Sequence, residues 1–157
     1  MIIPAFSRLL LDTHTIDRAV ADSDFRRRLT EAATNGILHL LITHVQIDEI
    51  VDMPESKDKR PALLEVLASL PAERIPTYGF ILDLSRLDNA RLTDDEGAAL
   101  IEALRGENLK HTEDSVLIAT AGYEDAAFVS SDKRALAAAR RHGIAALSLD
   151  ELDAMLR

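Results

Sequence analysis

Four short apolar runs stand out along the chain, and each is ended abruptly by polar residues. Runs this short and this uniformly apolar predict strands that are buried on both faces, as in a parallel sheet. The predicted strands cover residues 9–11, 37–42, 126–129 and 144–147.

Helices are expected between these strands, because apolar residues recur there at helical spacing. Some of them open with a capping box, in which a serine or threonine is followed three residues later by Glu or Gln. These boxes are Thr43 with Gln46, Thr93 with Glu96, and Ser148 with Glu151. Pro61 is well placed at the first position of a further helix. The expected helices start near residues 22–24, 43, 61, 93, 112, 133 and 148.

Strands that alternate with helices of about ten residues predict a three-layer α/β/α fold with a central, mainly parallel sheet. The segment 72–92 is the least readable part of the pattern, and residues 78–84 are a candidate strand within it. No linker, repeat or low-complexity tract interrupts the chain. We therefore expect one domain over residues 1–157.

The composition excludes several kinds of chemistry. The chain has no cysteine, so disulfides, thiolate metal sites and cysteine nucleophiles are ruled out. Acidic residues outnumber basic ones 27 to 18, and the net charge of −9 disfavours general attraction to a polyanion. Any nucleic-acid function must come from a localised site. No apolar run approaches the about 20 residues that span a bilayer, and no secretory signal is recognisable, so we expect a cytoplasmic protein with no membrane partner.

Polar residues that follow the predicted strands are the first candidates for function. Asp12, Thr43 and Asp132 each follow a different strand. The carboxyl ends of parallel strands share one edge of a sheet, and ligands of open α/β sheets bind at that edge. The sequence therefore predicts a functional site that contains these three residues.

Two acids on helices are candidates to join this edge. Glu49 borders the buried face, one to two turns into the helix that starts at Thr43. In the helix after Thr112, periodicity alone leaves both Glu113 and Asp114 open, and we favour Asp114. So many carboxylates in one place need a positive partner, and oxygen ligands select a hard cation such as Mg²⁺ or Mn²⁺.

Four stretches follow one another in an order that is typical of a known family. They are Leu9-Leu10-Leu11-Asp12-Thr13, Thr43 leading to Glu49, Asp114 to Ala121, and Val129-Ser130-Ser131-Asp132. In this order they resemble the PIN-domain nucleases, and the resemblance runs essentially from Leu9 to Leu152. Members of that family bind one or two Mg²⁺ or Mn²⁺ ions through four acids. Many small members are ribonuclease toxins of VapBC-type toxin-antitoxin modules.

The resemblance implies a PIN-like domain that hydrolyses phosphodiester bonds in single-stranded or structured RNA with the help of the metal. The acids that it assigns as metal ligands and catalytic residues are Asp12, Glu49, Asp114 and Asp132. Ser130 falls where its hydroxyl would orient Asp132 or a metal-bound water, and Thr43 is a supporting residue. The implied partners are the RNA substrate, a cognate antitoxin protein and a second copy in a homodimer.

Other interpretations of these residues stay open. The main alternative function is a catalytically silent PIN-like module that binds RNA or a partner protein. Asp12 and Asp132, each taken alone, are also explained as helix N-caps. A phosphatase of the haloacid dehalogenase type would have an acid where His14 stands. Phosphate contacts are candidate roles for the basic residues at 26–28 and for Lys133 and Arg134.

Overall fold

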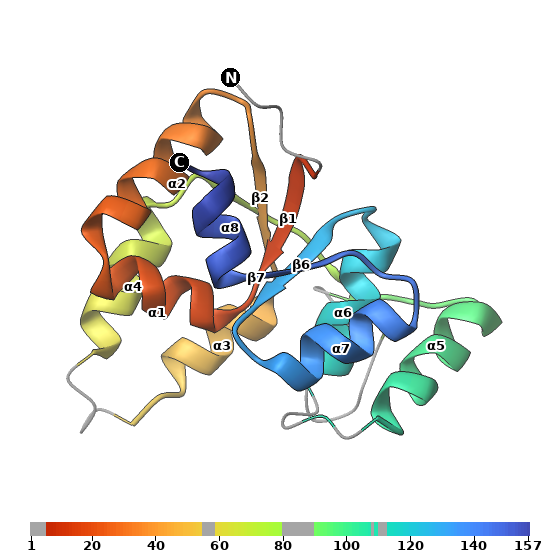
Figure 1. The fold of residues 1–157 in the computed structure, drawn as a ribbon. Helices are drawn as coiled ribbons and strands as arrows, with labels where there is room; N and C mark the ends of the chain where they lie inside the picture. The colour runs from red at the N-terminus through yellow and green to blue at the C-terminus, as the bar shows by residue number, and fades with distance from the viewer. Residues whose placement is uncertain (1–5, 55–58, 80–89, 108, 110–112) are drawn as a thin grey trace.

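Five parallel strands form the centre of the molecule (Figure 1). The computed structural model describes residues 6–54, 59–79, 90–107, 109 and 113–157. Within them the sheet order is β3-β2-β1-β6-β7, and every neighbouring pair is parallel. The strands are β1 (Arg8–Leu11), β2 (His39–Ile42), β3 (Ala72–Arg74), β6 (Ala127–Ser130) and β7 (Ala146–Ser148). Two further short strands, β4 (Thr77–Tyr78) and β5 (Ala90–Arg91), pair with each other.

Helices cover both faces of the sheet, which confirms the predicted three-layer α/β/α fold. One face packs against α1, α2, α4 and α8, and the other against α6 and α7, with α5 beside α6. The helices are α1 (Thr13–Ala21), α2 (Ser23–Thr34), α3 (His44–Val51), α4 (Arg60–Ser69), α5 (Asp95–Arg105), α6 (Glu113–Tyr123), α7 (Lys133–Arg141) and α8 (Leu149–Met155). No helix in these described segments is long and apolar enough to cross a bilayer.

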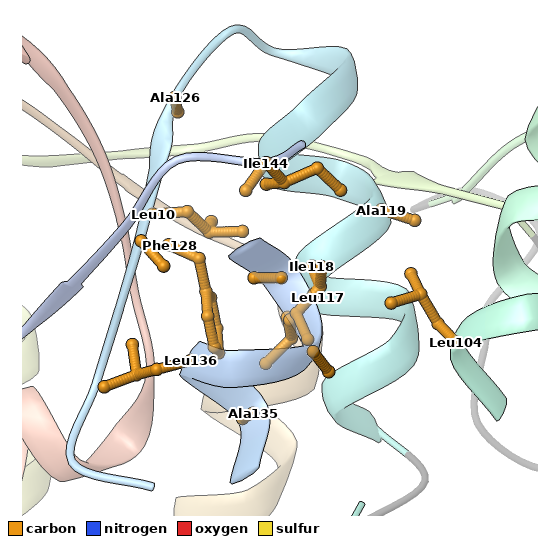
Figure 2. Close-up of a cluster of buried hydrophobic side chains, with 14 of the residues drawn as sticks. Leu10, Leu104, Leu117, Ile118, Ala119, Ala126, Phe128, Ala135, Leu136 and Ile144 are labelled. Atoms are coloured by element: carbon orange, nitrogen blue, oxygen red, sulfur yellow. The ribbon is translucent and has the colours of Figure 1, made fainter. Parts of the chain in front are cut away.

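The central strand β1 is buried on both of its faces. Leu10 packs into the cluster that includes Phe128 of β6 and Leu117 of α6 (Figure 2). Leu9 and Leu11 point to the opposite cluster, with the side chains of α1, α2, α4 and α8. This alternation follows from the two-residue period of a strand. It explains why the three consecutive leucines are all shielded from solvent.

The order of the strands reverses next to β1. Within the sheet, β2 and β3 lie to one side of β1, whereas β6 and β7, which come later in the chain, lie to its other side. The crevice outside the carboxyl ends of β1 and β6 is therefore the topological switch point, where open α/β sheets bind ligands. Asp12 follows β1 and Asp132 follows β6, so both acids flank this crevice.

A buried side chain links the carboxyl ends of β1 and β2. Gln46 donates from Nε2 to the Leu11 carbonyl at 2.6 Å, and its Oε1 accepts the Thr43 N–H at 2.9 Å. Thr43 in turn accepts the Val45 N–H, so the predicted capping box of α3 is confirmed. The box of Ser148 with Glu151 is confirmed at α8. Both boxes set the direction in which the chain leaves the sheet.

Two helices begin one residue away from their predicted starts. Asp94, not Thr93, caps α5, because the Asp94 carboxylate accepts the Gly97 N–H at 2.8 Å. Aspartate is a strong N-cap, and the cap therefore lies one residue later than predicted. Pro61 is the second residue of α4, which begins at Arg60. The predicted cap at Thr112 lies outside the described residues.

The helix α1 and the strands β3 and β5 were not predicted from the sequence. The helix α1 starts immediately after Asp12 and ends at Ala21, and the carboxylate of the next residue, Asp22, caps α2 through the N–H groups of Asp24 and Phe25. The edge strand β3 is largely exposed and has no apolar run to reveal it. Of the candidate strand at 78–84, Tyr78 ends β4, and residues 80–84 lie outside the described part of the chain.

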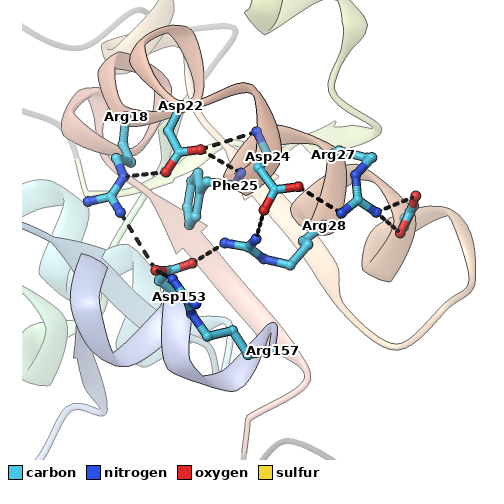
Figure 3. A network of polar contacts seen from close by, with 9 residues as sticks. Arg18, Asp22, Asp24, Phe25, Arg27, Arg28, Asp153 and Arg157 are labelled. Carbon is cyan, nitrogen blue, oxygen red and sulfur yellow. Dashed lines mark hydrogen bonds and ion pairs between the residues drawn. The ribbon is translucent and has the colours of Figure 1, made fainter.

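Ion pairs around Asp153 of α8 join three helices (Figure 3). The Asp153 carboxylate lies 3.6 Å from Arg18 of α1 and 3.1 Å from Arg157, and it also pairs with Arg28 of α2. The Arg18 guanidinium lies 5.5 Å from the centre of the Phe25 ring. Hydrogen bonds from Arg157 and Arg28 hold the pKa of the Asp153 carboxyl below its ordinary value. This network stabilises the helical layer that covers β1.

A matched pair of leucine substitutions tests the importance of the core. Leu10 is fully buried, whereas Leu92 is 89% exposed. Leu10→Ala should lower the free energy of unfolding by about 3 kcal/mol, because it leaves a cavity in a closely packed cluster. Leu92→Ala should change it by less than about 0.5 kcal/mol. Urea denaturation measures both values, and similar losses for the two variants would contradict the assignment of Leu10 to the core.

The Asp153 network predicts a pH-dependent stability. Asp153→Asn should lower the melting temperature by about 2–4 °C at neutral pH. The carboxyl pKa is lowered in the folded state, so its contribution is present above the ordinary value of 3.8 and is lost as the pH falls through the lowered value. Thermal melts of both proteins from pH 7 toward pH 2 check this. A difference that does not shrink in acid would contradict the ion-pair explanation.

Candidate functional site

A small pocket lies at the carboxyl edge of the sheet, and we call it the acid pocket. Its volume is about 30 Å³, which is large enough to hold a water molecule. Three of the four predicted acids line it, and they come from three separate elements of the fold. The lining residues are Asp12, Thr13, His14, Glu49, Glu113, Asp114 and Leu117.

Asp12 is fixed at the end of β1 by backbone and side-chain contacts. Its N–H donates to the Val129 carbonyl at 3.1 Å, which continues the pairing of β1 with β6. Its Oδ1 accepts the Thr15 N–H at 3.3 Å, and its Oδ2 lies 3.0 Å from Nδ1 of His14. Asp12 is therefore the N-cap of α1, and it also lines the acid pocket.

The contact with Asp12 changes the pKa of the His14 imidazole. The hydrogen bond to Asp12 raises the pKa of His14 above its ordinary value of 6.5, and the negative charges of Asp12, Asp17 and Glu49 act in the same direction. Burial opposes these effects without cancelling them. The imidazolium form is thus stabilised next to the carboxylates.

Glu49 reaches the acid pocket from α3. Its Oε2 accepts a hydrogen bond of 2.7 Å from the hydroxyl of Thr13, which immediately follows Asp12. This role of Thr13 could not be predicted from the sequence, because Thr13 and Glu49 are 36 positions apart and no spacing rule connects them. The hydrogen bond holds an otherwise exposed side chain on the pocket side of its helix.

Glu113 and Asp114 at the start of α6, between which the sequence pattern does not decide, differ in burial. Both Glu113 and Asp114 line the acid pocket. Asp114 is 8% exposed, whereas Glu113 is only partly buried. A carboxylate that is mostly removed from water needs a compensating partner more than an exposed one does. Asp114 is therefore the better candidate ligand, and Glu113 lies beside it.

Asp132 lies in a neighbouring hollow rather than in the acid pocket. We call this the basic hollow; its volume is about 350 Å³, and it is lined by His14, Ser131, Asp132, Lys133 and Arg134. His14 lines both spaces, so they adjoin. Oδ1 of Asp132 caps α7 by accepting the N–H groups of Arg134 and Ala135 at 2.9 and 3.4 Å. Oδ2 is buried and has no hydrogen-bond partner among the described residues.

The two supporting residues have defined contacts. Ser130 is fully buried, and its Oγ accepts the Asp132 N–H at 3.0 Å, which fixes the turn that leads from β6 to Asp132. Thr43 is fully buried at the start of α3, where it is a helix cap. Neither hydroxyl lines the acid pocket. The contacts of both residues position the backbone around the site.

The donor set of the acid pocket fits a hard divalent cation. Asp12, Glu49 and Asp114 supply only carboxylate oxygens, which Mg²⁺ and Mn²⁺ prefer. Asp132, in the adjoining basic hollow, adds a buried carboxylate oxygen that has no hydrogen-bond partner among the described residues. Within the described segments, no three His, Asp or Glu side chains already converge closely enough to hold a metal ion. The acids therefore share a pocket without forming a compact ligand cluster.

Comparisons with known proteins identify the fold. No protein-family model and no curated protein matches the sequence. A chain of the VapBC2 complex of Rickettsia felis, which was solved bound to a DNA fragment from its promoter, has a TM-score of 0.58 at 15% identity, over 90% of this chain and 98% of that one. A protein of Pyrobaculum aerophilum has the same TM-score at 15% identity, over 95% and 94% of the two chains.

A third similar structure is FitAcB from Neisseria gonorrhoeae. Its TM-score is 0.50 at 19% identity, over 88% of this chain and 96% of that chain. Identities this low establish likeness of fold and no more. Together the matches confirm the predicted PIN-like fold, of the type found in VapC toxins.

The contact between His14 and Asp12 predicts a measurable titration. In metal-free solution, NMR should show the His14 imidazole titrating above 6.5 in the wild-type protein and closer to 6.5 in Asp12→Asn. Because the pKa is raised in the folded state, the stability that this pair adds is present below 6.5 and is lost as the pH rises through the raised value. Asp95→Asn, an equivalent change at an exposed position of α5, should leave the titration unchanged. Equal midpoints in wild type and Asp12→Asn would contradict the contact.

Proposed function

We propose that this PIN-like chain is a Mg²⁺- or Mn²⁺-dependent endoribonuclease and the toxin of a toxin-antitoxin module. One observation carries the proposal: carboxylates from the end of β1, from α3 and from α6 line a single small pocket at the switch point of the sheet. Residues so far apart in sequence meet there only because of the fold. A site built this way is typical of a binding or catalytic centre in open α/β sheets.

Electrostatics favours a cation in this pocket. The chain has a net charge of −9, and carboxylates that share a pocket repel one another unless a positive charge compensates them. Asp12, Glu49 and Asp114 would hold the ion, and Asp132 would add a fourth acid at the edge. When bound, a divalent ion acts as a Lewis acid toward a phosphodiester and makes a water nucleophile available at neutral pH.

The protein's own side chains position this site. The Thr13 hydroxyl directs Glu49, and the His14 imidazole holds Oδ2 of Asp12. The Ser130 hydroxyl fixes the backbone before Asp132. These hydrogen bonds restrict the rotation of the acids, and the mutation of such supporting groups typically reduces metal affinity or activity by about 10- to 100-fold.

The likeness to VapBC2 and FitAcB supports the finer parts of the proposal. It favours RNA, single-stranded or structured, as the substrate, and a cognate antitoxin protein as the partner. A homodimer and a cytoplasmic location belong to the same proposal. These assignments rest on analogy between folds and are tested separately from the metal site.

A catalytically silent PIN-like module that binds RNA or a partner protein is the second candidate. The observation in its favour is that the acids of the described residues do not already form a compact ligand cluster. The observation against it is that a binder of RNA gains nothing from carboxylates that repel the polyanion.

A cleavage assay with purified protein separates the two functions. Labelled single-stranded and structured RNAs are incubated with Mg²⁺, Mn²⁺ or excess chelator. The wild-type protein should cut RNA only when metal is present. Asp12→Asn should lose at least about a hundredfold in rate, since it removes a direct ligand rather than a supporting group. Asp95→Asn, the matched control on α5, should keep full activity.

Two outcomes would overturn the nuclease proposal. One is undiminished turnover by a folded Asp12→Asn protein, and the other is cleavage that persists in chelator. Failure of the wild-type protein to cut any RNA, combined with tight RNA binding, would favour the silent module. Circular dichroism of each variant confirms that the fold is retained.

A further inference from the structure

Most arginine and lysine side chains in the described segments are paired with carboxylates. Arg8 with Glu124 and Arg141 with Glu107 are examples. Lys133 and Arg134 differ: both are exposed at the start of α7, and neither has an ion pair within the described part of the chain. In a protein with an excess of acids, two adjacent cations without a carboxylate partner are a distinctive feature.

Their position in the helix is electrostatically unfavourable. The N-terminus of a helix carries a partial positive charge, so cations are favoured in the last turn and disfavoured in the first. α7 also has cations in its last turn, where Arg140 pairs with Glu151 and Arg141 pairs with Glu107. Those two residues stabilise the helix, whereas Lys133 and Arg134 do not. Stabilisation of α7 therefore does not explain why Lys133 and Arg134 stand at its N-terminus.

Their position in the molecule suggests a different role. Lys133 and Arg134 line the basic hollow, which adjoins the acid pocket at His14. Among the described residues, Asp132 is the only acid that lines this hollow, and its Oδ1 caps α7 while its Oδ2 is buried. The charges that the hollow presents to solvent are thus mainly positive, directly beside the proposed site of cleavage.

We propose that Lys133 and Arg134 bind a backbone phosphate that neighbours the scissile one, so that the RNA strand runs from the acid pocket into the basic hollow. This inference rests on the proposed function and names the contacts that hold its substrate. Contacts to phosphate position a strand without reading its bases. The two residues are therefore positioning residues, and their effect does not depend on the sequence of the RNA.

Binding measurements test this role without turnover. The affinity of the full chain for a labelled single-stranded RNA is measured by fluorescence anisotropy, in chelator and at several salt concentrations. Lys133→Gln and Arg134→Gln should each raise Kd several-fold. Each should also reduce the slope of log Kd against log salt by about 0.7, the value expected for one lost phosphate contact on a single strand.

The matched control is Arg105→Gln. Arg105 is an exposed residue of α5 that pairs with Glu102 and lines neither the acid pocket nor the basic hollow. This variant makes the same charge change and should leave Kd and the salt slope close to the wild-type values. Melting temperatures supply a structural readout: Lys133→Gln and Arg134→Gln should match or exceed the wild-type value, because they remove cations from a helix N-terminus.

Several results would overturn the inference. One is a Kd and a salt slope that are unchanged in both variants. Another is an equal loss of affinity in Arg105→Gln, and a third is a fall in melting temperature that accounts for the weaker binding. With metal present, the double variant should show a raised KM and a nearly unchanged kcat. If the wild-type protein cuts RNA while the variants bind like it, only this inference fails. If the wild-type protein neither binds nor cuts RNA, the proposed function fails as well.

Discussion

The burial of β1 on both faces is the constraint on which the rest of the structure depends. Leu9, Leu10 and Leu11 are fully buried, with side chains alternating between the two core clusters. A strand in this environment pairs in parallel with neighbours on both sides, and the chain must turn at its carboxyl end. The first polar residue after the leucines, Asp12, is placed at the switch point of the sheet as a direct consequence.

The same constraint explains why acids from distant parts of the chain meet. Helices that follow parallel strands begin at the carboxyl edge, which brings the start of α3 and its Glu49 toward Asp12. α6 begins at the same edge with Glu113 and Asp114. Concentrating negative charge at one edge is unfavourable for folding alone. The cation that we propose for the acid pocket would neutralise this charge.

Much of this architecture could be predicted from the sequence. The apolar runs predicted the strands β1, β2, β6 and β7, and the capping boxes at Thr43 and Ser148 predicted two helix starts, because these signals are local. The exposed edge strand β3 carries no such signal. The short helix α1 was missed, because the predicted helix start at residues 22–24 is that of α2 and no start was placed directly after Asp12.

The site was predictable in its residues but not in its contacts. Strand ends and helix faces pointed to Asp12 and Glu49 but left Glu113 and Asp114 open, and all four of these acids line one pocket. The hydrogen bond from Thr13 to Glu49 and the displacement of Asp132 into the basic hollow depend on tertiary packing. The catalytic and metal-binding roles of these acids, and the single domain over residues 1–157, stay predictions.

A crystal structure of the protein grown with Mn²⁺ tests the central claim most directly, because anomalous scattering locates the ion without assuming its ligands. The account predicts a manganese peak in the acid pocket, with carboxylate oxygens of Asp12 and Asp114 about 2.1 Å away. Glu49 should lie in contact with the ion or one water away from it. Manganese bound only elsewhere on the surface, with the acid pocket free of it at saturating concentration, would contradict the account.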